Sequence, residues 1–172
     1  MALIGGHQAG DIGHIDDHNA IDNALANNTT DHTNIFTTLA GKGAAQVDSV
    51  ESAESTTSTA YTNLATAGPA VTVTLTSGQL CLVLLSCGVW HSSPNGQYGF
   101  AGFAVSGAAS QAAADTDAAR LQIKTELDDL ATSRSAVYIA PTAGTFTFTM
   151  KYRCSSADSS VFTHRRIVVV PL

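Results

Sequence analysis

The sequence has few charged residues and few cysteines, and each shortage excludes a class of protein. Charged side chains make up 13% of the 172 residues, about half the usual share. They form no basic stripe, so nucleic-acid binding is not expected. The three cysteines, Cys81, Cys87 and Cys154, are an odd number without a disulfide framework, which indicates assembly in a reducing cytoplasm.

A membrane-spanning run and a secretory start are also missing. The apolar run at residues 81–89 has the length of a buried strand and is too short to cross a bilayer. Residues 1–4 lack the positive charge and the long apolar stretch of a signal peptide. Neither membrane association nor signal-directed export is therefore expected.

The charges that are present are unevenly placed. Residues 1–60 carry eight acidic side chains and one basic one, whereas residues 61–172 carry six acidic and seven basic side chains. The acidic first third is either a solvated segment or a segment that faces a basic surface.

Residues 1–40 combine a glycine-rich start with a helical pattern. Side chains spaced by three and four residues keep one phase from residue 18 to residue 39, as in a coiled-coil heptad. Helix propensity is weak over residues 27–30, so the pattern predicts either one short coiled coil or two helices with a break near residue 29. A seam this polar needs partner chains or a host surface to hold it. The seam positions predicted to form an oligomer interface are Ile21, Leu25, Asn28, His32, Ile35 and Leu39.

Residues 41–60 predict a linker. The segment begins with Gly41 and is rich in Ser, Thr, Ala and acidic residues, and its only large apolar side chains are Val47 and Val50. That composition is typical of a spacer between parts with different roles.

Residues 61–172 show the pattern of a β-domain. About seven short strands separated by turn signals predict an antiparallel β-sandwich or jelly roll. The fold class is therefore mostly β, with a short helical segment before the C-terminal domain. The expected strands are 71–75, the nearly continuous apolar run 80–90, 98–105, an alternating segment at Leu121, Ile123 and Leu127, 136–140, the alternating segment 145–153, and 167–170.

Two parts of the sequence resemble known virion proteins. Residues 61–66, 68–73, 103–107, 145–147, 151–153 and 165–172 look like a β-domain found at the C-termini of many of these proteins. Residues 110–134 fit that pattern least well. The N-terminal stretch is similar to a signature of virion structural proteins from phages of Actinobacteria and reads Gly10-Asp11-Ile12-Gly13-His14-Ile15-Asp16-Asp17-His18-Asn19.

The resemblance implies a trimeric jelly-roll-like domain displayed on the outer surface of a virion assembled in the host cytoplasm. Capsid decoration is the expected function, because the chain is short and carries one display domain. Residues 1–40 are expected to dock on the major capsid protein, with His7, Asp11 and His14 as attachment residues. A minor tail or tail-fibre protein, which contacts tail proteins or a host receptor, is the alternative.

Catalytic patterns are weak. His14 and His18 are spaced to share a helix face and hold a metal ion. A metalloprotease requires Glu directly after the first His, where Ile15 stands, and capping by Asp16 or Asp17 explains the segment more simply. The sequence contains neither a Gly-x-Ser-x-Gly elbow nor a phosphate-binding glycine loop. No enzymatic activity, cofactor or metal is expected.

Aromatic residues gather around the loop at residues 94–96. Trp90 precedes this loop, and Tyr98 and Phe100 follow it. Such side chains either anchor a β-core or stack on a sugar.

Overall fold

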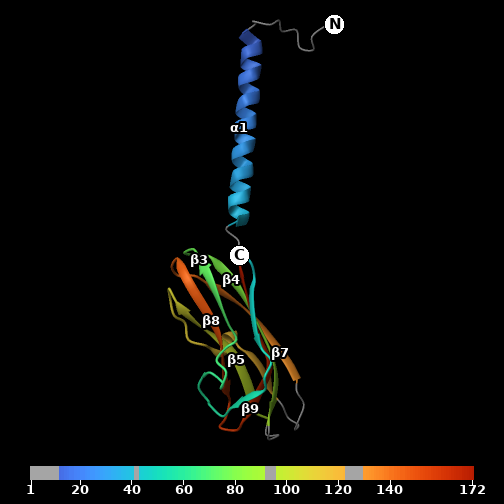
Figure 1. The fold of residues 1–172 in the computed structure, drawn as a ribbon, viewed down its shortest axis with the longest axis vertical. Helices are drawn as coiled ribbons and strands as arrows, with labels where there is room; N and C mark the ends of the chain where they lie inside the picture. The colour runs from blue at the N-terminus through green and yellow to red at the C-terminus, as the bar shows by residue number, and fades with distance from the viewer. Residues whose placement is uncertain (1–11, 41–42, 92–95, 123–129) are drawn as a thin grey trace. The chain divides into compact units, whose positions relative to one another are not determined.

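A computed structural model describes residues 12–40, 43–91, 96–122 and 130–172, with the side chains of residues 20–34 in the N-terminal helix. The chain forms two compact units, Met1–Lys42 and Gly43–Leu172. The first unit contains the helix α1, and the second contains all the strands (Figure 1).

Helix α1 runs without a break over Ile12–Ala40. The open question of one helix or two is thus answered in favour of one. In the polar stretch around residue 29, the threonine hydroxyl groups bond to carbonyl groups of the preceding helical turn. Thr29 Oγ1 donates to Leu25 O at 3.0 Å, and Thr30 Oγ1 donates to Ala26 O at 3.0 Å. These bonds satisfy hydroxyls that otherwise compete with the helical backbone.

The second unit is an antiparallel two-sheet sandwich with a jelly-roll-like fold, as predicted. The five-stranded sheet has the order β1-β9-β4-β7, with β2 also paired to β9, and the four-stranded sheet has the order β3-β8-β5-β6. The strand bounds are β1 Gln46–Val50, β2 Glu54–Thr56, β3 Ala70–Leu75, β4 Leu80–His91, β5 Tyr98–Gly107, β6 Ala119–Gln122, β7 Leu130–Ile139, β8 Gly144–Cys154 and β9 Ser160–Pro171.

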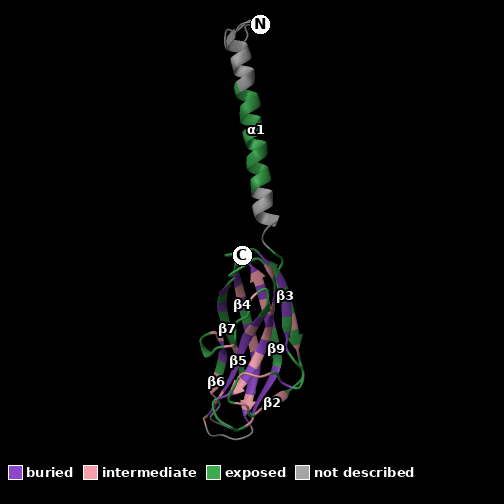
Figure 2. Ribbon diagram, turned by 90° about the vertical axis from the view of Figure 1, so that its left-hand side faces the viewer, coloured by how far each residue is buried: buried purple, intermediate pink, exposed green. Residues whose placement is uncertain are grey.

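The core lies between the sheets, and β8 contributes most clearly to it. Its alternating pattern places Phe146, Phe148, Met150 and Tyr152 inside, because successive side chains of a strand point to opposite faces. Phe148 meets Tyr138 of the other sheet edge to face, with ring centroids 5.2 Å apart. Figure 2 shows this alternation of burial along the strands, whereas the described part of α1 is exposed throughout.

The predicted linker at residues 41–60 is wrong where the segment forms strands, and from Gly43 onward it belongs to the second unit. Residues 46–50 and 54–56 form β1 and β2, and both strands pair with β9. Polar contacts of Asp48 and Glu54 help to hold this segment in the domain. Arg165 of β9 has no exposed side-chain surface, and Glu54 Oε2 lies 3.2 Å from its Nη2. A buried guanidinium requires such a partner, and the sequence pattern did not reveal it.

Two other strands extend beyond their predicted bounds. Strand β7 begins at Leu130 and β9 begins at Ser160, and both added segments are rich in polar residues. Their register along β4 is set by backbone pairing, which apolar periodicity does not report. Residues 123–129, with the predicted strand positions Ile123 and Leu127, lie outside the described residues, while Leu121 belongs to β6.

Candidate functional site

The described part of the helical seam is open in the single chain. Ile21 and Leu25 are each 63% exposed, and Asn28 and His32 are exposed as well. Their spacing places them along one side of α1, where apolar surface remains uncovered. The interface prediction stays a prediction, and the side chains of Ile35 and Leu39 lie outside the described residues.

The predicted attachment residues cannot be placed in a site. His7 and Asp11 lie outside the described residues, and His14 belongs to α1 with its side chain outside them. The same holds for His18, its possible partner as a metal ligand. Within the described part of the chain, no group of three or more His, Cys, Asp or Glu side chains is arranged to hold a metal ion. No described helix is long and apolar enough to cross a membrane.

The sandwich presents an aliphatic surface that the sequence analysis did not identify. It lies on the outer face of the five-stranded sheet, where paired residues form rows across the strands. Leu80 lies opposite Ile139, and Leu82 lies between Val170 and Val137. The next row holds Val47, Val168, Leu84 and Ser135. We call the aliphatic members of these rows the aliphatic patch: Val47, Leu80, Leu82, Leu84, Val137, Ile139, Val168 and Val170.

The exposure of the patch is high for aliphatic side chains. Exposed fractions are 41% for Leu80, 37% for Leu84, 54% for Val47, 62% for Val137 and 58% for Ile139. The sequence carried a signal for this surface, because the run at 80–90 is apolar at nearly every position. The run at 80–90 predicts a central strand, and a central strand that is covered on both faces is apolar at nearly every position. In the described chain, β4 is central in its sheet and covered on one face.

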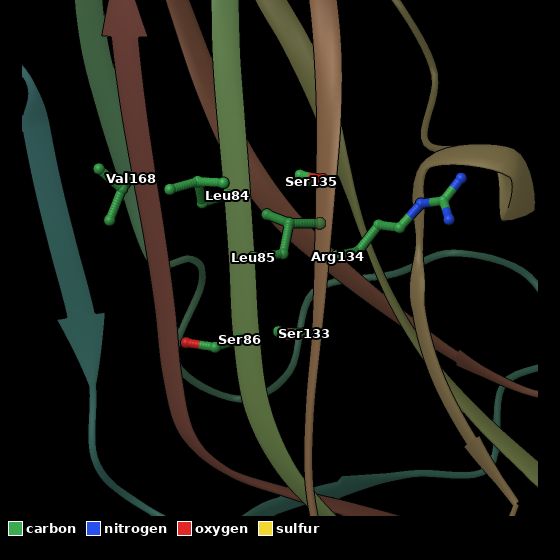
Figure 3. A pocket seen from close by; sticks show the side chains of 7 residues that line it. All are labelled: Leu84, Leu85, Ser86, Ser133, Arg134, Ser135 and Val168. Atoms are coloured by element: carbon green, nitrogen blue, oxygen red, sulfur yellow. The ribbon is translucent and has the colours of Figure 1, made fainter.

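A shallow hollow borders the patch. Leu84, Val168, Ser86, Ser133 and Ser135 line it together with Leu85 and Arg134 (Figure 3). The small serine side chains leave the space open. Arg134 points away from the hollow, and its Nη2 donates to Thr116 O at 2.7 Å. The hollow therefore marks the change from an aliphatic to a polar surface along the same sheet face.

The outer face of the four-stranded sheet has the opposite character. Thr72 lies opposite Thr147 with the hydroxyl oxygens 2.9 Å apart, and Thr74 lies opposite Thr145. Hydroxyl pairs on a strand surface are compatible with water. This face is an ordinary solvated side of a sandwich.

One aromatic cluster lies farther along that polar sheet. Arg153 Nε donates to Asp115 Oδ1 at 2.9 Å, and its guanidinium carbon lies 3.9 Å from the centre of the Phe100 ring. The Tyr61 hydroxyl donates to the same carboxylate at 2.9 Å. The hydrogen bond from Arg153 keeps the pKa of Asp115 below its usual value. Phe100 is buried beneath Arg153 and lies outside the core cluster between the sheets, whereas Trp90 packs against that core. The covered face of the Phe100 ring is not open for stacking on a sugar.

The structure also joins one serine to one histidine. Ser160 Oγ and His91 Nδ1 lie 2.8 Å apart, which is the distance of a nucleophile and its base. Their exposed fractions are 0% and 1%, so a substrate has no access to the pair. Burial lowers the pKa of His91 and favours the neutral ring. This arrangement ties β4 to β9 and does not form an open site.

Comparison with known proteins gives a likeness of fold alone. No family model and no curated protein matches the sequence. Among solved structures, the chain is similar to Eiger TNF from S. frugiperda, with 10% identity over 70% of this chain and 91% of that chain, and a TM-score of 0.40. It is also similar to the infectious bursal disease virus Gx strain structure, with 13% identity over 75% of this chain and a TM-score of 0.43.

A third similar structure is the C-terminal domain of EclA, described as a sugar-binding protein. It has 16% identity, a TM-score of 0.35, and coverage of 71% of this chain and 81% of that chain. The chain spans only 33% of the infectious bursal disease virus chain. At these identities the matches are distant, and they assign no ligand or partner to this chain.

Proposed function

We propose that this chain is a non-enzymatic structural protein of a tailed-phage virion and that it decorates the outer face of the capsid as a homotrimer. The single observation that carries the proposal is the division of the chain into a helix that is exposed over its described side chains and a self-contained sandwich. The described part of α1 exposes every side chain, whereas the sandwich buries its own aromatic and aliphatic core. A helix without a core of its own needs a partner.

The two units have different roles in this proposal. The seam of α1, including Ile21 and Leu25, associates with the same seam in two other copies. Residues 1–40 dock on the major capsid protein, and the resemblance of residues 10–19 to phage virion proteins supports this assignment. The sandwich is displayed outward. Three linked arms bind more strongly than one, because each contact raises the local concentration of the next.

Decoration of the shell also stabilises it. A protein that binds only the assembled capsid shifts the equilibrium toward that assembled state by mass action. This mechanism requires affinity and correct placement and no chemical step. Assembly in the host cytoplasm is consistent with three buried cysteines in the sandwich that form no disulfide.

The test is binding to virions produced without this protein. Purified full chain is added, and electron microscopy locates it on the particle. The proposal expects many copies over the shell and no binding by the sandwich alone, residues 43–172. A few copies at the tail assign the chain to the tail instead. Equal decoration by the isolated sandwich removes attachment from residues 1–40.

A further inference from the structure

From Leu80 to Leu85, strand β4 is apolar on both faces, but the described chain covers only one. Its inward side chains, from Cys81 to Val89, are at most 2% exposed. On the other face, Leu80 and Leu84 keep 41% and 37% of their surface open. An antiparallel sheet with one solvated face normally alternates apolar and polar residues. The absence of alternation in β4 indicates that its outer face is covered in the functional protein.

The uncovered surface is not a general property of the composition. The four-stranded sheet follows the usual rule, with paired threonines such as Thr72 and Thr147 on its outer face. The aliphatic patch extends over β1, β9, β4 and β7, so all four strands of the main sheet path contribute to it. An apolar surface built from four strands in register is a feature of the sheet as a whole.

The size of the patch fits an interface between protein chains. Its five most exposed side chains leave on the order of 500 Å² open, which is as much as the largest apolar patch of a typical monomer. A standard interface takes about 800 Å² from each partner, and about 65% of that area is apolar in homodimers. The patch therefore supplies the apolar share of one such interface.

The chemistry of the patch favours a second copy of this chain. Its rows hold aliphatic side chains and Ser135, and the row beyond them holds Ser49, Arg166, Ser86 and Ser133. An aliphatic centre beside a polar margin is typical of permanent contacts between identical chains. Sugar recognition instead uses aromatic platforms, and an ionic partner requires charges within the surface.

The position of β1 supplies the second argument. Val47 belongs to the patch and follows Ala40, the last residue of α1, within a few residues. Association through the helical seam therefore tethers the patches of three copies by short connections. Short tethers give effective concentrations in roughly the millimolar range, at which a patch of this size associates.

We propose that the aliphatic patch is a contact between copies of this chain within the homotrimer. This inference rests on the homotrimer of the proposed function and gives it a second contact surface, in the sandwich. Two contacts along one chain keep the displayed domains together and prevent them from moving independently at the ends of the helices.

The first test compares matched charge substitutions in the full chain. V137D places a carboxylate in the patch, and T74D places one on the polar outer face of the other sheet. Val137 is exposed in the single chain, so V137D is expected to fold. Sedimentation should show the trimer of V137D dissociating at a concentration higher by roughly tenfold or more, with T74D unchanged. Equal dissociation of the two variants overturns the proposal.

The second test measures how fast a reagent labels a cysteine that is introduced into the patch. All three native cysteines are buried, so I139C and T74C each carry one accessible thiol. In the full-chain trimer, a thiol reagent should label I139C at least roughly tenfold more slowly than T74C, and adding L25D should abolish the difference.

The labelling results distinguish failure of the patch contact from failure of the trimer. Fast labelling of I139C in an intact trimer overturns the patch contact and leaves the helical trimer in place. Slow labelling that persists when L25D has made the chain monomeric shows that the chain covers its own patch, and this also overturns the inference. A full chain that is monomeric and rapidly labelled contradicts both the trimer and the patch contact.

Discussion

Arg165 is the residue on which the folding of residues 43–60 depends. Its side chain is fully buried and bonded on several sides. Nη2 lies 3.2 Å from Glu54 Oε2, 3.4 Å from Ser52 O and 3.3 Å from Ser52 Oγ. The guanidinium also lies over the ring of Tyr152. Removing a partner from a buried ion pair leaves an uncompensated charge, which is among the most destabilising changes in a small domain.

The first prediction follows from this pair. E54Q should lower the free energy of unfolding by about 3 kcal/mol, because it leaves Arg165 buried without a counter-charge. E51Q is the matched control, since Glu51 is exposed and lies 4.0 Å from the exposed His164. Its effect should stay within about 0.5 kcal/mol. Urea unfolding followed through the single tryptophan, Trp90, measures both, and equal effects contradict the assignment.

The second prediction concerns pH. Hydrogen bonds from Thr66, together with the charge of Arg165, keep the pKa of Glu54 below its ordinary value of 4.5. A depressed carboxyl pKa stabilises the fold above the unfolded-state pKa, and this contribution is lost as the pH falls through the folded-state value. The difference in unfolding free energy between wild type and E54Q should therefore be constant above about pH 5.5 and shrink below pH 4.5.

This experiment requires the unfolding free energy of E54Q to be subtracted from that of the wild type at each pH. The pKa of Asp115 is also lowered, by the hydrogen bond from Arg153, so it adds its own acid dependence. That dependence is present in both proteins and cancels in the difference. A difference that stays constant to pH 3 contradicts the proposed role of Glu54.

At the scale of elements, β1 and β2 are part of the sandwich. They complete one side of the five-stranded sheet, pairing along β9 from Val169 to Ser160. Ala70 N also donates to Asp48 Oδ2 at 2.8 Å, which connects β1 to the start of β3. The boundary between the two units therefore falls after Lys42 and not at residue 60.

The third prediction tests that boundary with two truncations. Residues 43–172 should unfold cooperatively, with nearly the stability of the sandwich in the full chain. Residues 61–172 should be less stable by at least about 3 kcal/mol, because Arg165 loses Glu54 and β9 loses its pairing with β1 and β2. Thermal unfolding followed by circular dichroism compares them. Equal stability restores the linker interpretation of residues 43–60.

The fourth prediction concerns α1. L25D should prevent trimer formation by the full chain, since a charge in an apolar seam position is not compensated. N23D adds the same charge away from the seam and should leave the mass of the assembly unchanged. Light scattering distinguishes the two. If both variants keep the mass of the wild type, the helical seam is not the contact.

At the scale of the whole molecule, the two units differ in how they gain stability. The sandwich buries its own core, so it should stay folded when the trimer dissociates. The described surface of α1 is exposed, so its helix content should depend on association. Dilution of the full chain should therefore reduce the helical signal near 222 nm before the Trp90 signal of the sandwich changes, and simultaneous loss contradicts this division.

The sequence predicts those strands whose residues alternate between apolar and polar or are apolar throughout. Residues 71–75 and 145–153 alternate and form β3 and β8, and the run 80–90 forms β4, because hydrophobic burial acts on each side chain at its own position. The helix is predicted by the three- and four-residue spacing of its seam positions. Its continuity through residue 29 is not predicted, since it depends on hydroxyl groups that bond either to the helix or elsewhere.

The sequence by itself determined that this chain has a helical arm and a β-sandwich, since periodicity is a local property of the chain. Only the tertiary structure decided that residues 46–56 belong to the sandwich, because the partner that holds them, Arg165, is distant in sequence. It also decided that Leu84, Val137 and Val47 meet on one open surface. Register between strands sets which side chains are neighbours, and no single segment carries that information.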